Sequence, residues 1–127
     1  MSSLKTFVGA WALCLLAPAA LTAAPGDLTR QFATCTGRLS AQMEFQWLLS
    51  DTGSDRTEEE RAAMISLLEA VVRPEDRRNA LALRIEAKQA HTALLTRAHF
   101  NDDKAQATWA ANRAAVEIGR CRSLILG

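Results

Sequence analysis

The sequence predicts an all-α protein, an antiparallel up-down-up-down four-helix bundle closed by one disulfide and preceded by a cleaved signal peptide. Three observations predict this fold class. Apolar residues recur at spacings of three and four in four separate stretches. No stretch after residue 23 alternates apolar and polar residues over the length of a strand. Short clusters of turn-forming residues separate the four stretches, which is typical of bundles with antiparallel neighbours.

The first 23 residues have the layout of a secretory signal peptide. A short basic segment ends at Lys5, an apolar segment follows, and small residues precede the expected cleavage site after Ala23. An uncleaved membrane anchor is the alternative, but Pro18 interrupts the apolar segment. Cleavage would leave residues 24–127, enough for a single helical domain with no stable membrane span. We therefore expect a secreted protein of a bacterial periplasm.

The charge balance bears on the class of partner. The chain has 15 Lys and Arg against 14 Asp and Glu, and loss of Lys5 with the signal peptide leaves 14 of each. Proteins that bind nucleic acids carry a basic excess, because they must neutralise phosphates. The neutral mature chain therefore argues against a nucleic-acid partner.

The first two helices are predicted at about 28–49 and 57–73. Apolar side chains on one stripe define the first helix: Leu28, Phe32, Cys35, Leu39, Met43 and Trp47. Thr57 and Glu60 have the spacing of a capping box at the start of the second helix. Pro74 ends this second helix.

The third and fourth helices are predicted at about 75–99 and 102–125. Pro74 and the acidic residues after it favour a helix start, and the sequence Asn-Asp-Asp at 101–103 is expected to cap the fourth helix. The fourth helix is rich in Ala and Gly, which permit close approach of a neighbouring helix.

Cys35 and Cys121 are the cysteines that remain after cleavage. Exported proteins fold in an oxidising compartment, where an even number of cysteines indicates disulfides. In an antiparallel bundle the beginning of the first helix and the end of the last lie at the same height. We therefore predict a structural Cys35–Cys121 disulfide, rather than a redox-active or metal-binding pair.

Four polar residues are predicted to meet inside the bundle. His91 lies on the apolar arc of the third helix in line with Arg84, and Gln42 and Gln46 lie on or beside the apolar stripe of the first. Buried polar groups need partners, so this interior polar cluster is either a satisfied network or the lining of a ligand pocket. The sequence leaves both interpretations open.

The sequence contains few features that would indicate a cofactor or a catalytic site. A haem could be held between Met43 and His91, but the Cys-x-x-Cys-His attachment motif is absent. We expect no metal site. No nucleophile motif, phosphate loop or paired acid and base is recognisable, so we predict no catalytic residues and no enzymatic activity.

The end of the first helix carries a candidate interaction patch. Phe45, Leu48 and Leu49 widen the apolar face beyond what one neighbouring helix covers, whereas Trp47 and Trp109 are expected in the core. The preferred hypothesis is a non-enzymatic accessory protein that binds an unknown protein partner or forms a homodimer. A small-ligand or haem binder that uses the bundle interior is the alternative.

Overall fold

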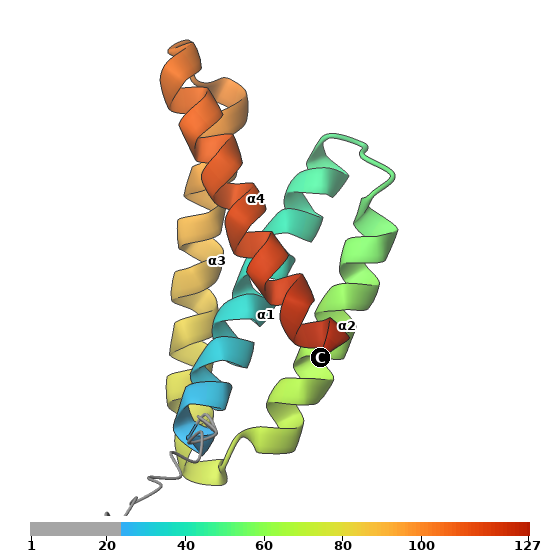
Figure 1. The fold of residues 1–127 in the computed structure, drawn as a ribbon, viewed down its shortest axis with the longest axis vertical. Helices are drawn as coiled ribbons and strands as arrows, with labels where there is room; N and C mark the ends of the chain where they lie inside the picture. Colours follow the sequence, from blue (N-terminus) through green and yellow to red (C-terminus); the bar gives the residue numbers. More distant parts are fainter. Residues whose placement is uncertain (1–23) are drawn as a thin grey trace, which may run out of the picture.

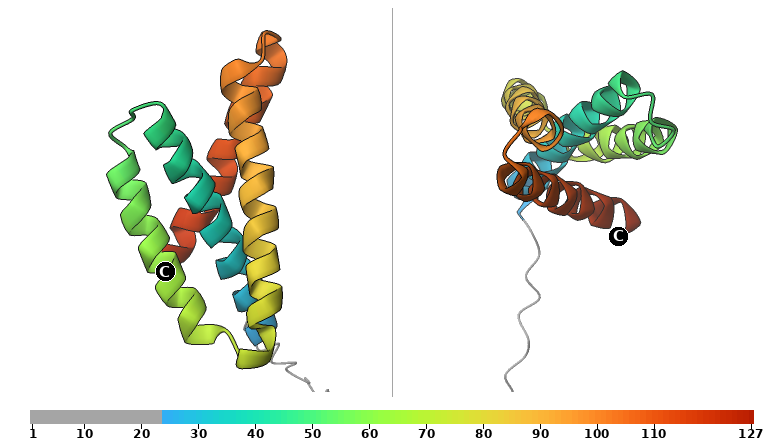
Figure 2. Two further views of the ribbon diagram at one scale, coloured as in Figure 1. Left: turned by 180° about the vertical axis from the view of Figure 1, so that it is seen from behind. Right: turned by 90° about the horizontal axis from the view of Figure 1, so that it is seen from above.

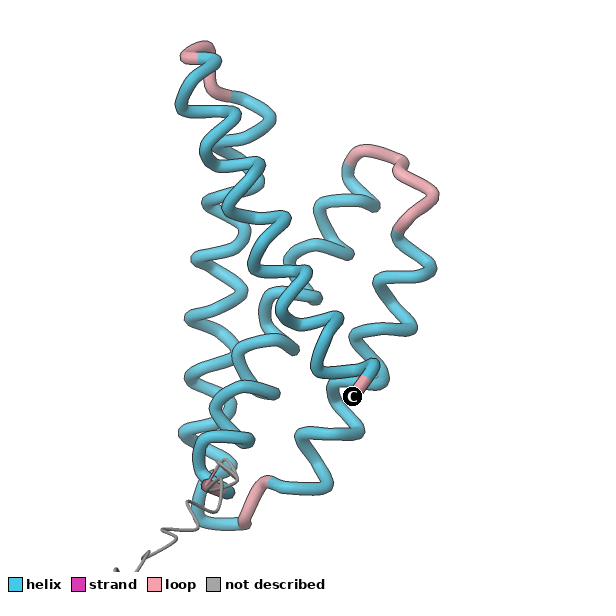
Figure 3. The backbone as a smooth tube through the Cα atoms, in the orientation of Figure 1, coloured by secondary structure: helices cyan, strands magenta, loops and turns pink. Residues whose placement is uncertain are grey.

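The computed structural model describes residues 24–127, and these residues form four α-helices and no strand (Figure 1). The helices are α1 (Pro25–Leu48), α2 (Ser54–Val71), α3 (Arg77–Phe100) and α4 (Lys104–Leu126), with a 3-10 turn η1 (Pro74–Asp76) before α3. The connections between them are short (Figure 3). The all-α, four-helix prediction is confirmed. The predicted signal peptide lies outside the described residues.

The start of α2 differs from the prediction. The helix begins at Ser54, so Thr57 lies inside it and the predicted capping box is wrong. The Thr57 hydroxyl donates to the Gly53 carbonyl at 3.1 Å, while the Asp51 carboxylate accepts from the Gly53 amide at 2.8 Å. The turn closed by Asp51 thus starts the helix three residues before the predicted cap.

The start of α4 follows the sequence more closely. Asp103 is the N-cap, and its Oδ1 accepts from the backbone amides of Ala105 at 3.0 Å and Gln106 at 3.2 Å. These bonds satisfy two of the amides that a helix start leaves without partners. The predicted capping role of the acidic residues before α4 is confirmed at Asp103.

The helices are arranged around α1. It packs against α2 on one side and α3 on the other, and α4 crosses it obliquely (Figure 1). The view along the long axis shows the same crossing (Figure 2). Between α2 and α3 no Cα atoms come within 8 Å of each other. The end of α4 reaches α2, where Arg122 Nε donates to both carboxylate oxygens of Glu60 at 2.9 Å.

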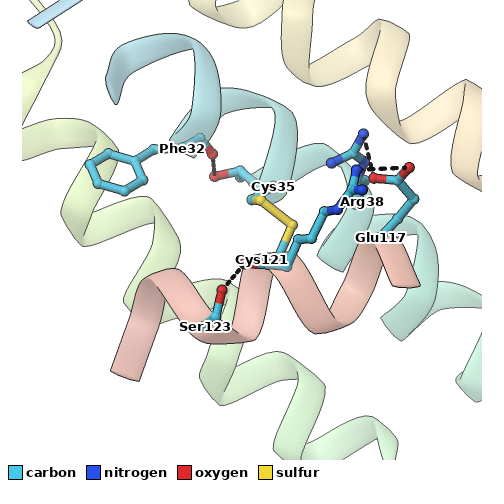
Figure 4. Close-up of a disulfide and its surroundings, with 8 residues drawn as sticks. Phe32, Cys35, Arg38, Glu117, Cys121 and Ser123 are labelled. Carbon is cyan, nitrogen blue, oxygen red and sulfur yellow. Dashed lines mark hydrogen bonds and ion pairs between the residues drawn. A yellow bond between two sulfur atoms is a disulfide. The ribbon is translucent and has the colours of Figure 1, made fainter. Parts of the chain in front are cut away.

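The main core surrounds a disulfide. Cys35 of α1 and Cys121 of α4 are bonded, with their Cα atoms 5.4 Å apart (Figure 4). The predicted pairing is confirmed. The core around the disulfide includes buried side chains from every α-helix, among them Phe32, Leu39, Met64, Leu68, Ala80 and Ile118. The disulfide therefore joins the first and last helices at the centre of this cluster.

Gly37 allows α1 and α3 to touch through their backbones. A Cβ at residue 37 would collide with the carbonyl oxygen of Arg84 and would lie 3.0 Å from the amide nitrogen of Lys88. Both obstacles are backbone atoms of α3, so no side-chain rotation could relieve the contact. The close packing of α1 on α3 thus requires glycine at this position.

Both tryptophans expected in the core are on the surface. Trp47 is 52% exposed and Trp109 is 54% exposed. The apolar stripe of α1 extends past the point at which neighbouring helices cover it. In Figure 1 the beginning of α4, which carries Trp109, lies beside α3. The Arg97 guanidinium lies 5.8 Å from the centre of the Trp109 ring and partly covers it.

Within residues 24–127, none of the helices combines the length and the apolar character that crossing a membrane requires.

Candidate functional site

A buried carboxylate at the crossing of α1 and α4 organises the most polar part of the interior. Glu117 of α4 is 3% exposed. Its Oε2 lies 2.9 Å from Arg38 Nη2, and its Oε1 lies 2.5 Å from Arg113 Nη2 and 3.8 Å from Arg120 Nη1. Figure 4 shows Arg38 and Glu117 pointing toward each other beside the disulfide. Three guanidinium groups therefore surround one carboxylate.

Local helical geometry explains how these groups meet. Arg113 and Arg120 lie one turn before and one turn after Glu117, so they share its face of α4. Arg38 lies on α1 one turn after Cys35, and Glu117 lies one turn before Cys121. The disulfide therefore brings Arg38 and Glu117 to the same height on the two helices.

His91 is almost completely buried on α3 beside this cluster, with 1% exposure. Its Nε2 lies 3.0 Å from Gln42 Oε1. An amide oxygen accepts only, so Nε2 carries the proton and donates, and Nδ1 is left as an acceptor. Nδ1 is buried and has no hydrogen-bond partner among the described residues. Burial, followed by the positive charge of Arg38, lowers the pKa of His91 to about 4, against a smaller opposite effect of Glu117. The imidazole is therefore neutral at physiological pH.

A cleft between α1, α3 and α4 lies over these groups, with a volume of about 390 Å³. Its size falls within the range of small-molecule sites. Apolar and small side chains of α3 form one wall, and charged side chains come from all three helices. The lining comprises Arg30, Thr34, Arg38, Leu83, Glu86, Ala87, Ala90, His91, Leu94, Arg113 and Glu117.

The predicted interior polar cluster is only partly assembled. The structure brings Gln42 and His91 into a hydrogen bond. Gln46 lies one turn further along α1, near Gly53, and its buried Oε1 has no hydrogen-bond partner among the described residues. Arg84 lines two hollows that both include Leu81, and it does not line the cleft that contains His91. The four residues therefore do not form one site.

The sequence predicted Gln46 and Arg84 beside His91, but charged residues that it did not indicate lie there instead. Arg38, Arg113 and Glu117 were not singled out, nor was Arg30. One signal was present, because Glu117 falls between Ala114 and Cys121 on the face of α4 that is buried. A carboxylate on a buried stripe requires a cationic partner.

Met43 and His91, the two residues considered as haem ligands, are both buried. Met43 is 5% exposed and lies on the buried face of α1. His91 Nε2 is already hydrogen-bonded to Gln42, so an iron atom would have to displace that bond. In residues 24–127, no cluster of three or more His, Cys, Asp or Glu side chains has the arrangement of a metal site.

Of the three residues of the predicted interaction patch, Leu48 and Leu49 are exposed and Phe45 is not. Phe45 is buried, with its ring centre 5.0 Å from that of His99 and 6.2 Å from that of Phe100. Leu48 is 69% exposed and Leu49 40%. Two further large side chains belong here: Trp47 on the same helix end and Phe100, which is 65% exposed beside Phe45. We call the exposed set the α1-end patch: Trp47, Leu48, Leu49 and Phe100.

Comparison of the chain with protein-family models, with curated proteins and with solved structures found no match.

Proposed function

We propose that the chain is a small non-enzymatic accessory protein that binds a protein partner through the α1-end patch. In this proposal residues 1–23 export the chain to the periplasm, and the mature domain is an up-down-up-down helical unit. The observation that carries the proposal is the run of three consecutive large apolar residues at 47–49, each at least 40% exposed. Large apolar side chains that are exposed together at one end of a molecule are typical of interaction sites in soluble proteins.

The patch is presented by an ordered support. One turn before Leu48 and Leu49, Phe45 is buried and packs edge-to-face against His99 and Phe100 of α3. Phe45, Leu95 and Ala114 form a second small core at this end of the molecule. The backbone that carries the exposed side chains therefore needs little ordering on binding, which lowers the entropic cost of association.

The composition of the patch favours a partner with an apolar groove. Tryptophan is strongly enriched among residues that dominate binding energy, and Trp47 lies in this patch. A half-exposed aromatic side chain offers on the order of 100 Å² for burial. The patch has four exposed side chains of about this size or smaller. Two copies of the patch placed face to face would therefore bury less than the ~1,200 Å² of a stable interface. A concave surface on a different protein would enclose the same side chains more fully.

Crosslinking in the native host tests this proposal. A photoreactive phenylalanine analogue is placed at Leu48, and at Asn112 on the exposed face of α4 as the matched control. We expect one crosslinked protein from position 48 that is absent from position 112, and that is lost when Leu49→Glu is added. The captured protein is then purified, and its affinity for wild type and Leu49→Glu is measured; we expect at least a tenfold difference.

Two outcomes would contradict the proposal. Equal affinity of wild type and Leu49→Glu for the captured protein would show that the patch does not bind it. Crosslinking of the chain to itself, with a dimer mass in light scattering that Leu49→Glu converts to a monomer, would instead identify a homodimer. Circular dichroism of Leu49→Glu serves as the folding control, because residue 49 lies outside the core.

A further inference from the structure

The charges in the cleft between α1, α3 and α4 are unbalanced. Arg38, Arg113 and Arg120 all lie within 4 Å of the single carboxylate of Glu117. Arg30 also lines the cleft, and no hydrogen bond or ion pair joins its side chain to any other residue of 24–127. Three arginines and two glutamates, Glu86 and Glu117, line the cleft, so the lining carries an excess of one positive charge.

Free hydrogen-bonding capacity accompanies this charge. A guanidinium group has five N–H donors, and the contacts with Glu117 engage few of those on Arg113, whose side chain is 50% exposed. Arg38 is 26% exposed. Arginine donors are arranged as a planar fork that fits a carboxylate. The cleft therefore offers donors suited to an oxyanion.

The remaining wall of the cleft, on α3, is mainly apolar, and Glu86 is its charged member. Leu83, Ala87, Ala90 and Leu94 lie along one side of α3 and span about 16 Å of helix at 1.5 Å per residue. His91 stands among them and is neutral, since burial and Arg38 lower its pKa. A bound molecule would thus meet cationic side chains from α1 and α4, and on α3 an apolar strip beside the carboxylate of Glu86.

We propose that this cleft binds a small organic acid, whose carboxylate pairs with Arg30 and Arg113 next to Arg38 and whose apolar part lies on the Leu83–Leu94 strip of α3. The volume of about 390 Å³ accommodates a molecule of this class. Arg38 is held in place by Glu117, so this guanidinium is positioned before the ligand arrives. The site is separate from the α1-end patch and does not depend on it.

Titrations of the oxidised, exported protein followed by NMR test the proposal. Hexanoate, acetate, hexylamine and inorganic phosphate are added in turn, while the Nε–Hε signals of arginine and the backbone amides of α3 are observed. We expect saturable shifts with hexanoate at Arg38, Arg113 and Ala87, at least tenfold weaker binding of acetate and phosphate, and no shifts with hexylamine. The preference for hexanoate over acetate measures the contribution of the apolar strip.

Variants identify the groups that bind. Arg30→Gln and Arg113→Gln should each weaken hexanoate binding at least fivefold, whereas Arg56→Gln, which removes the same charge from α2, should leave it unchanged. Arg30 is exposed, so Arg30→Gln carries the test if Arg113→Gln disturbs folding. Leu49→Glu should bind hexanoate normally even if it abolishes partner binding, which keeps this proposal distinguishable from the proposed function.

Three results would overturn the proposal. Equal weakening by Arg56→Gln would show an unspecific effect of net charge. Phosphate binding as tight as hexanoate binding would show an anion site with no preference for organic acids. The absence of saturable shifts with hexanoate would show that the cleft does not bind this class of molecule.

Discussion

Replacement of Gly37 by alanine tests the contact that positions α1 on α3. A Cβ at this position collides with the Arg84 carbonyl and lies 3.0 Å from the Lys88 amide nitrogen. Because both neighbours are backbone atoms, the whole of α3 must shift away from α1. Such overpacking costs about 1–3 kcal/mol, and occasionally more. We place Gly37→Ala at or above the upper end of this range, because no side chain can move aside.

Gly119 provides the matched control, because the same substitution there meets no atom within 4 Å. Both glycines lie inside helices, where alanine is more favourable than glycine by about 1 kcal/mol. Gly119→Ala should therefore gain about 1 kcal/mol in the free energy of unfolding. At Gly37 the same gain is outweighed by the backbone collision, which leaves a net loss of about 2 kcal/mol.

Urea denaturation of the oxidised protein, followed by circular dichroism at 222 nm, measures both free energies. The linear extrapolation resolves the expected difference of about 3 kcal/mol between the two variants, provided that their m-values agree. A Gly37→Ala variant as stable as Gly119→Ala would refute the reasoning, because α1 and α3 would then not be in backbone contact.

Three further predictions concern the disulfide and the buried charges. The Cys35–Cys121 bond closes a loop with a sequence separation of 86, so the double Cys→Ala variant should lose about 4–5 kcal/mol on urea denaturation; a loss below about 1 kcal/mol would contradict the loop-entropy estimate. The pKa of His91 is about 4 in the folded chain against 6.5 ordinarily. The neutral, buried imidazole therefore contributes fully to the free energy of unfolding above pH 6.5, and this contribution is lost as the pH falls through 4. The full loss is about 3 kcal/mol. Denaturation at pH 7 and pH 4 measures it, and an equal decrease in His91→Gln would assign it to other groups. Glu117→Gln removes the group that raises the pKa of His91, so NMR titration of the His91 ring should show a lower pKa, whereas a higher pKa would refute the assignment.

The apolar spacing identified four helices, but not which parts of them are covered. Trp47 continues the stripe of Leu39 and Met43, which are buried, and yet half of Trp47 is exposed. Periodicity records the face of a helix, whereas burial depends on how far the neighbouring helices extend along it. The α1-end patch is exposed because α1 extends beyond the part of it that the neighbouring helices cover.

The candidate site was predicted least completely, since it combines residues from three helices. Gln42 and His91 were recognised because polar residues on apolar stripes require partners. Arg84 was placed with them because it lies one heptad before His91, but α3 turns this side chain toward a different hollow. Arg38 and Glu117 lie on separate helices, and nothing in their local sequences indicates the crossing that joins them.

The sequence by itself determined the helical class, the approximate helix ends and the Cys35–Cys121 pairing. These features depend on local spacing, on capping chemistry and on the number of cysteines. Only the tertiary structure decided the backbone contact at Gly37, the exposure of both tryptophans and the cluster of three arginines around Glu117. These features depend on the angle at which α4 crosses α1 and on the distance between α1 and α3, and both follow from the packing of all four helices together.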